Sequence, residues 1–392
     1  MQVLLFAAGA LFVWGQWRVG RSGMADFRVY FDAAAAWWAG ESPYGRAFGV
    51  SSGFYKYAPV ALVPFLPLVA LGWTAARWVY WALLLALFAW GIPRLLDGMH
   101  RLLSAGQTHS PTPHRTLLTF ALVLCGSHHL GRELLLGNVN AILLAALGGW
   151  WWALNRSARS VRFAAVTTGV AAVGLGAIWA FKPHFLVLLP WLVVRKPLHH
   201  AVLSVLAFAL WLLLPALGVG WEENLGLLRE WWETIRMHNT DTSHSSNTIA
   251  SWWGLQAPWN AVPPLLVMAA WGGWVLRRRR QGVGERGAFL EGAVVVALLP
   301  NLVHTDTEHF MWSLPLVAVW LLRLAEARYW PSVGQRWAVG AVLALCMVPY
   351  ALGTPDLWGS ETAAWLERGG PLGVANLLLV LGAVWMWPQR TT

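Results

Sequence analysis

Long apolar stretches recur along the chain, separated by shorter polar segments. Each is roughly 15 to 23 residues long, which is enough for a tilted helix to cross a bilayer. We therefore predict an all-α polytopic membrane protein with about twelve transmembrane helices. Because Pro183 opens one stretch, that segment is predicted to be re-entrant or broken. Hydropathy places the spans at residues 2–17, 74–96, 114–130, 138–154, 163–180, 183–194, 200–219, 260–276, 288–303, 310–323, 337–353 and 371–387.

The composition supports a membrane location. The 392 residues are 57% hydrophobic and 12% charged, and the mean hydropathy is +0.51. A soluble domain carries about 25% charged residues. No soluble domain is visible, so we expect one membrane domain over residues 1–392. Cys125 and Cys346 fall inside apolar spans and imply no disulfide framework.

The charges are divided unevenly between two sets of loops. If the N-terminus is cytoplasmic, the loops on that side carry most of the 28 Lys and Arg residues. Such an excess is typical of cytoplasmic loops. The run Arg277–Arg280 ends a predicted span, so we interpret it as an anchor at the membrane rather than a nucleic-acid patch. This pattern predicts a multi-pass plasma-membrane protein without a nucleic-acid partner.

The opposite loops are longer and hold clustered Asp, Glu, His and Asn residues. A carrier would need polar groups along the midplane and on both sides of the membrane. Here the interiors of the predicted spans are nearly free of charge. The distribution favours a membrane-embedded enzyme that acts at the extracytoplasmic face. A lipid or polysaccharide flippase or carrier is the alternative.

The first outer loop covers about residues 18–73. Residues 27–38 are amphipathic at helical spacing, which predicts a helix lying in the membrane interface. Asp26 comes just before it, so its carboxylate either caps the helix or accepts a proton from a substrate. Tyr44 follows in a turn, and Lys56 begins a proline-broken apolar segment that we expect to be kinked.

Two further polar clusters sit at the outer ends of predicted spans. In SHHLGRELLLGNVNAILL, residues 127–144, an Arg132–Glu133 pair within a hydrogen-bond network is the simplest interpretation, and metal binding by the adjacent histidines is the alternative. The same segment contains Asn138 and Asn140. In AFKPHF, Lys182 either attracts an anionic phosphate or extends to the interface.

The last two clusters lie later in the chain. The outer loop at about 220–259 begins with a second amphipathic helix and continues with a stretch rich in hydroxyls, amides and His that includes Asn247. That stretch could bind a sugar or remain a solvated loop. In PNLVHTDTEHFMWSLP, a short turn contains His304, Asp306, Glu308 and His309. Their side chains could ligate a divalent metal, or bind a phosphate and sugar hydroxyls.

Several ordered motifs resemble those of glycosyltransferase family 87, polytopic enzymes of the GT-C fold class that includes polyprenyl-phosphate-mannose-dependent mannosyltransferases. The motifs are D-x-x-V-Y and G-x-x-x-Y in ADFRVYFDAAAAWWAGESPYG, K-Y-x-P in FYKYAPVALVPFLPL, G-x-x-N in LLGNVNAILL, K-P in FKPHF, and P…H…L-P in PNLVHTDTEHFMWSLP. The chain departs from the pattern at Asn138, where a Gln is usual, in the His-Thr-Asp-Thr insertion after residue 300, and in the loosely matching Asn247-Thr248-Ile249.

The resemblance implies a GT-C-type fold and an inverting transfer of a sugar, with mannose as the family's usual choice, from a polyprenyl-phosphate donor to a glycolipid or glycan acceptor. It implies that Asp26 is the general base, that Lys182 and His309 lie near the donor phosphate, and that no divalent metal or other cofactor is required. A metal-dependent membrane hydrolase built on residues 304–309 is a further alternative. The full predicted substrate-binding set is Lys182, His309, His304, Asp306, Glu308, Arg132, Asn138, Asn140, Tyr44, Lys56 and Asn247.

Overall fold

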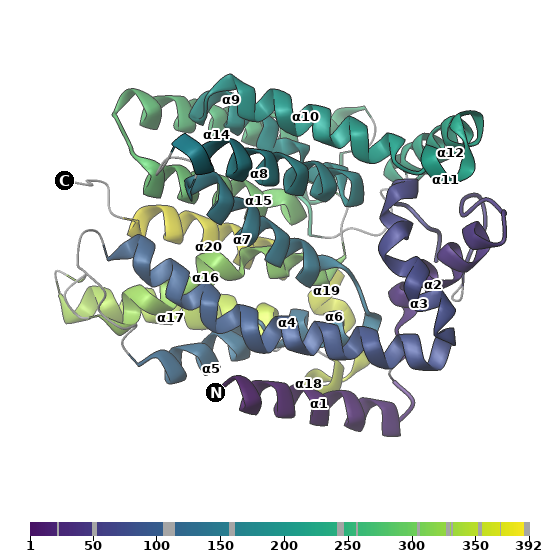
Figure 1. Ribbon diagram of the computed structural model, residues 1–392. Coiled ribbons are helices and arrows are strands. Elements are labelled where there is room, and N and C mark those ends of the chain that lie inside the picture. The colour runs from purple at the N-terminus through teal and green to yellow at the C-terminus, as the bar shows by residue number, and fades with distance from the viewer. Residues whose placement is uncertain are drawn as a thin grey trace. The chain divides into compact units, whose positions relative to one another are not determined.

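The computed structural model of the chain is helical over the residues it describes (Figure 1). Within these ranges one isolated β-bridge pairs Ala47 with Phe54 in the first predicted outer loop. The described residues are 1–21, 23–48, 53–104, 114–156, 161–240, 247–255, 258–303, 306–326, 330, 332–351, 355–368 and 370–387.

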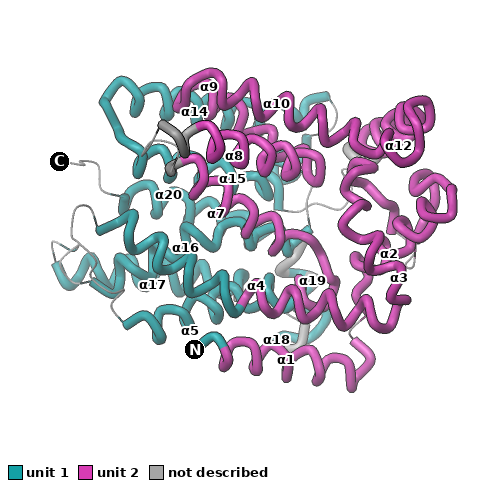
Figure 2. Tube along the Cα trace, viewed as in Figure 1, with its two compact units in different colours: residues 1–2, 89–131, 242–392 teal, residues 3–88, 132–241 magenta. Residues whose placement is uncertain are grey.

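The chain forms two compact units, each assembled from segments distant in sequence (Figure 2). Unit 1 comprises residues 1–2, 89–131 and 242–392, and unit 2 comprises residues 3–88 and 132–241. Helices α4 and α6 each contribute residues to both units.

Unit 2 contains the N-terminal helices and the middle of the chain. Its elements are α1 (Gln2–Arg18), α2 (Ala25–Trp38), η1 (Pro59–Phe65), α3 (Leu66–Ala70), the first half of α4 (Gly72–Leu103), the second half of α6 (Ser127–Leu136), α7 (Asn140–Arg156), α8 (Val161–Phe181), η2 (Pro183–Val187), α9 (Leu188–Arg195), α10 (Leu198–Leu213), α11 (Ala216–Val219) and α12 (Trp221–Thr240).

Helix α8 packs against both α7 and α10 in unit 2. Gly176 permits the close approach of α8 to α10, because a Cβ atom there would lie 2.7 Å from the backbone nitrogen of Phe208. Small residues at such crossings let helix backbones approach closely in membrane proteins. Trp179 on α8 donates its indole N–H to the carbonyl of Phe185 in η2 at 2.8 Å.

Unit 1 contains the C-terminal helices. Its elements are the remainder of α4 and α6, α5 (Arg115–Cys125), α13 (Ile249–Trp252), η3 (Trp259–Ala261), α14 (Val262–Arg280), α15 (Glu285–Leu302), η4 (Thr307–Ser313), α16 (Leu314–Ala325), α17 (Val333–Ala351), α18 (Pro355–Trp358), α19 (Ser360–Arg368) and α20 (Pro371–Met386).

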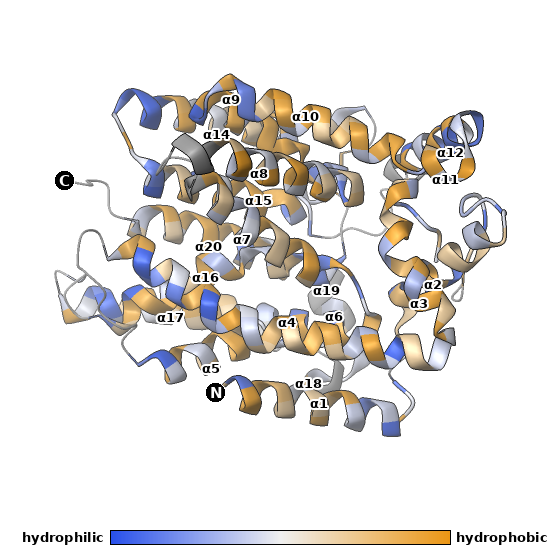
Figure 3. Ribbon diagram, in the orientation of Figure 1, coloured by the Kyte–Doolittle hydropathy of each residue, from blue (hydrophilic) through white to orange (hydrophobic). Residues whose placement is uncertain are grey.

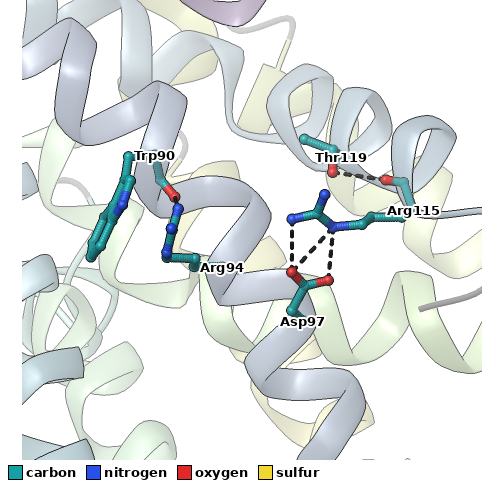
Figure 4. Close-up of polar contacts among 5 residues, drawn as sticks. All are labelled: Trp90, Arg94, Asp97, Arg115 and Thr119. Carbon is teal, nitrogen blue, oxygen red and sulfur yellow. Dashed lines mark hydrogen bonds and ion pairs between the residues drawn. The ribbon is translucent and has the colours of Figure 1, made fainter. Parts of the chain in front are cut away.

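Ion pairs contribute to the helix contacts of unit 1. Asp97 on α4 accepts three hydrogen bonds from the guanidinium of Arg115 on α5, and Figure 4 shows the two side chains facing each other. Arg278 on α14 donates to the Glu291 carboxylate on α15 at 2.9 Å, with both side chains almost fully buried. One member of the Arg277–Arg280 run therefore anchors a helix–helix contact.

Among the described residues, three helices are long and apolar enough to cross a membrane: Gly72–Leu103, Leu198–Val219 and Val333–Tyr350. A fourth span arises if Ser127–Leu136 and Asn140–Leu154, bent by 114°, count together. Shorter apolar helices occupy Pro59–Ala70, Arg115–Cys125, Ala165–Phe181, Pro183–Arg195 and Pro371–Met386. Most of the helices, α10 for example, are largely apolar along their length (Figure 3). The all-helical, apolar architecture is confirmed, whereas twelve spans and the GT-C fold stay predictions.

The third predicted span, 114–130, is divided. Helix α5 ends at Cys125, and α6 continues from Ser127 as far as Leu136. Gly126 lies at the break, where a Cβ atom would be 2.8 Å from the side chain of Leu314. The segment that contains Arg132 and Glu133 is consequently helical.

Candidate functional site

The start of α2 contacts the C-terminal end of α6 and the glycine that follows it. Met24 has a positive φ of 47°, and its N–H donates to the carbonyl of Leu135 at 3.0 Å. Gly137 ends α6 with a φ of +68°, and a Cβ atom there would lie 2.7 Å from the Cβ of Phe27. Glycine is therefore needed both for its conformation and for the space.

Asp26 lies in the first turn of α2. The prediction that it occupies the N-cap position was wrong, because the helix begins at Ala25 and Met24 is the capping residue, with no side-chain cap bond. Asp26 is half-buried, and its Oδ2 accepts a hydrogen bond of 2.6 Å from Nδ2 of Asn138. The Asn138–Asp26 hydrogen bond thus links α2 to the turn before α7. The predicted helix is confirmed as α2, whereas its place in the membrane interface stays a prediction.

Asn138 is also bonded through its oxygen. Its Oδ1 accepts the N–H of Val139 at 2.7 Å and the hydroxyl of Tyr30 at 3.4 Å. Burial, followed by the proximity of Tyr57 and of Asp26, raises the pKa of Tyr30 well above its usual value. The Tyr30 phenol is thus neutral and able to donate.

A second chain of hydrogen bonds begins at Lys182, the extended residue between α8 and η2. Its Nζ donates to Oδ1 of Asn140 at 2.7 Å, and Nδ2 of Asn140 donates to Oε2 of Glu133 at 3.1 Å. The other Glu133 oxygen accepts the N–H of Ala141 at 2.8 Å. Lys182, Asn140 and Glu133 are all buried. Asn140 therefore links the ammonium of Lys182 to the carboxylate of Glu133.

Tyr57 joins these two sets of bonds. Its hydroxyl lies 3.1 Å from that of Tyr30, and its ring centroid lies 5.8 Å from Nζ of Lys182. Because Tyr30 donates to Asn138, the Tyr57 hydroxyl donates to Tyr30. The hydrogen-bond chain that begins at Lys182 therefore gains a cation–π contact between Nζ of Lys182 and the Tyr57 ring.

The rest of the predicted first outer loop is tied to α12. The Tyr44 hydroxyl donates to the carbonyl of Tyr57 at 2.7 Å, and Trp231 on α12 donates to the carbonyl of Lys56 at 3.1 Å. Ser42 also donates to Glu230. Burial, with a smaller contribution from Glu230, raises the pKa of Tyr44 well above its usual value. The amphipathic helix predicted at the start of residues 220–259 is confirmed as α12.

The remaining predicted residues of unit 2 are Lys56 and Arg132. Both are half-buried. Glu133 accepts hydrogen bonds from Asn140 and from a backbone N–H, and the Arg132–Glu133 pair stays a prediction.

Unit 1 holds a separate group of predicted residues. Ligand atoms of Asp306, Glu308 and His309 lie within 4.8 Å of one another, and these side chains could hold a metal ion. Nδ1 of His309 lies 3.0 Å from the carbonyl oxygen of Asp306, and its ring meets the edge of Trp312. Glu308 and His309 are buried and Asp306 is exposed. His304 lies outside the described residues.

Asn247 joins three segments of unit 1. Its carbonyl accepts from Asn301 at 3.2 Å, and its Oδ1 accepts the N–H of Gly373 at 3.2 Å. Its substrate-binding role stays a prediction, because these bonds serve the packing of α13 against α15 and α20.

The structure thus brings together Asp26, Asn138, Asn140 and Lys182 in unit 2, and Asp306, Glu308 and His309 in unit 1. Sequence reasoning missed the connecting tyrosines. Tyr30 ends the D-x-x-V-Y motif, and Tyr57 belongs to K-Y-x-P. The motifs themselves carried the signal that could have identified both residues.

A model of glycosyltransferase family 87 matches residues 54–305, well over half of the chain. The chain belongs to this family, and it is a membrane glycosyltransferase. The matched region includes Lys56, Arg132, Asn138, Asn140, Lys182 and Asn247, whereas Asp26 precedes it and His309 follows it. No curated protein matches the chain significantly.

Proposed function

We propose that the protein transfers a sugar from a polyprenyl-phosphate donor to a glycolipid or glycan acceptor, with mannose as the first sugar to test. The observation that carries this proposal is the pairing in unit 2 of a half-buried carboxylate, Asp26, with a buried cation, Lys182, through a shared network of amides and phenols. A base and a positive potential are the two requirements of a transfer in which a phosphate leaves.

Asp26 acts as the general base. The acceptor hydroxyl gives its proton to the Asp26 carboxylate while its oxygen forms a bond to the anomeric carbon of the donor sugar. The bond between that carbon and the phosphate oxygen breaks, and its electrons leave with the polyprenyl phosphate. Direct displacement inverts the configuration at the anomeric carbon.

Cations stabilise the leaving phosphate. Lys182 is buried, so it contributes positive potential from within the protein, where charge is weakly screened. Lys56 and Arg132 are half-buried and are proposed to reach the headgroup directly. His309, Asp306, Glu308, Asn247 and His304 remain candidates for binding the phosphate or sugar hydroxyls, and no divalent metal is required for the step.

The enzyme acts in the plasma membrane with its N-terminus in the cytoplasm and its site at the extracytoplasmic face. Support comes from the excess of Lys and Arg in the alternate loops and from the apolar helices. Attachment of cysteine-reactive labels to single cysteines placed in the loops of intact cells tests this orientation.

The deciding experiment measures transfer of radiolabelled mannose from synthetic polyprenyl-phosphate-mannose to a membrane lipid extract, using purified protein with EDTA present. We expect a labelled product from the wild-type protein and none from Asp26→Asn. Product from a different lipid-linked sugar would keep the mechanism and change the donor. An active Asp26→Asn protein would overturn the role of Asp26. Lipid translocation in proteoliposomes without any labelled product would favour the flippase alternative.

A further inference from the structure

Arg77 is a cation near the start of α4 that lies against two aromatic rings. Its guanidinium carbon is 5.6 Å from the ring centroid of Trp78 and 5.5 Å from that of Trp81. The side chain is half-buried, and its Nε atom is enclosed without a hydrogen-bond acceptor among the described residues. Aromatic faces attract the positive charge, but they do not replace an oxygen as the acceptor of a buried N–H. Arg77 is therefore placed to receive an acceptor from a ligand.

Two arginines elsewhere in the helices find such an oxygen within the protein. Arg115 donates to the carboxylate of Asp97 at 2.8 Å. Arg94, further along α4, also contacts a tryptophan, with its guanidinium carbon 4.1 Å from the centroid of the Trp90 ring. It nevertheless donates to the carbonyl of Trp90 at 3.2 Å, as Figure 4 shows. A cation–π contact thus accompanies an oxygen acceptor at Arg94, whereas in the described part of the chain Nε of Arg77 has only the rings.

The rings beside Arg77 are held in place by their own contacts. Trp81 is buried and donates its indole N–H to the carbonyl of Leu134 on α6 at 2.6 Å. Trp78 is exposed, and its ring centroid lies 4.9 Å from that of Trp81 and 6.1 Å from that of Trp17 on α1. The guanidinium therefore lies beside one ring anchored in the interior and one ring at the surface. A cation that is already positioned loses little further freedom when an anion binds.

Arg77 also lies one helical turn from a residue that meets the proposed base. Residues three apart are neighbours on a helix, so Tyr80 follows Arg77 on the same side of α4. Tyr80 donates to the carbonyl of Asn138 at 3.1 Å, and its ring stacks on that of Phe27 with centroids 4.3 Å apart. Asn138 in turn donates to Asp26, the residue that precedes Phe27. Arg77 and Asp26 thus belong to the same region of unit 2, at the start of α4.

The chemistry of this position favours a phosphate. A guanidinium is planar and permanently charged, and its paired N–H groups match two oxygens of a phosphate. Helix α4 is long and apolar enough to cross a membrane, and tryptophans are enriched at the depth of the lipid headgroups. We propose that Arg77, beside Trp78 and Trp81, binds the phosphate of a membrane lipid. This phosphate belongs either to the polyprenyl-phosphate donor, a source that rests on the proposed function, or to an anionic phospholipid of the bilayer, which does not.

The experiment measures the binding of lipids to the purified full-length protein in detergent, by native mass spectrometry over a range of lipid concentrations. The probes are polyprenyl phosphate, phosphatidylglycerol and polyprenol. Polyprenol has no phosphate, so it reports the affinity for the isoprenoid tail alone. The variants are Arg77→Gln, Arg77→Lys and, as the matched control, Arg94→Gln, which removes a guanidinium from the same helix and from a similar tryptophan contact. Melting temperatures show whether each variant is folded.

We expect Arg77→Gln to raise the Kd of at least one phosphate-bearing probe about tenfold, equivalent to about 1.4 kcal/mol, and to leave the Kd of polyprenol unchanged. Arg77→Lys keeps the charge without the planar fork, so it should recover only part of the affinity. Arg94→Gln should leave all Kd values unchanged. A rise confined to polyprenyl phosphate assigns the site to the donor, a rise confined to phosphatidylglycerol assigns it to a bilayer phospholipid, and a rise for both assigns it to lipid phosphates in general.

A folded Arg77→Gln protein with wild-type Kd values for both phosphate-bearing probes would overturn the proposal, and so would an equal rise in the Kd of polyprenol. Should Arg77→Gln fail to fold, Arg77→Lys supplies the same test, because the proposed contact requires the planar fork and wild-type affinities in that variant would contradict it. Failure of the proposed function is distinguishable, because binding is measured without transfer. It would appear separately, as the absence of labelled product from wild-type protein with any lipid-linked donor.

Discussion

The hydroxyl of Tyr44 donates to the main-chain carbonyl of Tyr57 at 2.7 Å, and this bond fastens the turn after α2 to the segment that carries Lys56. Sequence reasoning assigned Tyr44 to substrate binding. In the structure the side chain is buried, and its hydroxyl hydrogen is donated to another group of the protein. Its contribution to activity is therefore expected to be indirect.

Tyr44→Phe should lower the free energy of unfolding by about 1 kcal/mol, because it removes one hydrogen bond and leaves the carbonyl of Tyr57 without this donor. Thermal unfolding in detergent measures this loss. The donor and acceptor KM values should change less than about threefold, corresponding to less than 1 kcal/mol of binding. A large change in acceptor KM with wild-type stability would restore Tyr44 to the substrate-binding set.

Lys182→Met should raise the donor KM at least about tenfold, because it removes the buried positive charge and leaves Oδ1 of Asn140 without its donor. Lys182→Arg should recover part of the affinity. Kinetics at varied donor concentration supply both values. The matched control is Lys196→Met, at the end of α9, and equal effects at the two positions would show that the role of Lys182 is not specific.

Asn376 on α20 lies at the centre of a buried network in unit 1. It accepts from Ser313 at 2.5 Å and from Tyr350 at 2.6 Å, and it donates to Asn301 at 2.6 Å and to the carbonyl of Ala297 at 2.7 Å.

Asn376→Leu should therefore cost about 2 kcal/mol or more, since several buried groups lose a partner together. A fall in melting temperature measures it. Leu381→Ala, at an exposed position of the same helix, is the control and should change the melting temperature little. Equal falls for the two variants would contradict a structural role for the network.

Removal of divalent metal tests the cluster of Asp306, Glu308 and His309. Transfer in EDTA should equal transfer in Mg²⁺ or Mn²⁺ if these side chains bind substrate and no metal. Glu308→Gln removes a buried carboxylate and should alter the kinetics identically with and without EDTA. If EDTA removed the activity and added metal restored it, and if Glu308→Gln prevented that restoration, a metal ion would be placed at this cluster.

The sequence predicted the class and the helices better than the contacts. Apolar length and the excess of basic residues in alternate loops depend only on composition along the chain, so all-helical membrane architecture was accessible. The break at Gly126, inside the predicted span 114–130, was missed because hydropathy does not register a glycine that is required for space. The assignment of Asp26 to the N-cap failed for a related reason, since the residue before a helix is decided by backbone conformation at Met24.

The candidate site was predicted as a set of residues and not as an arrangement. Motif order identified Asp26, Asn138, Asn140 and Lys182, but the bonds among them join residues 112 and 42 positions apart. Nothing in local sequence reveals which end of an amide faces which charge. Equally, Lys182 was expected to face a headgroup, and only packing shows that it is buried.

The absence of a side chain at Gly137 also affects the position of the site residues around it. The start of α2, which carries residue 26, is placed by this missing side chain as well as by a hydrogen bond, since side-chain carbons of Met24 and Phe27 lie where a side chain on residue 137 would otherwise be. The smallest residue of the turn thereby acts as a spacer beside the proposed catalytic base. Adding even one methyl group would push the base and its acceptor apart without altering a single reacting atom.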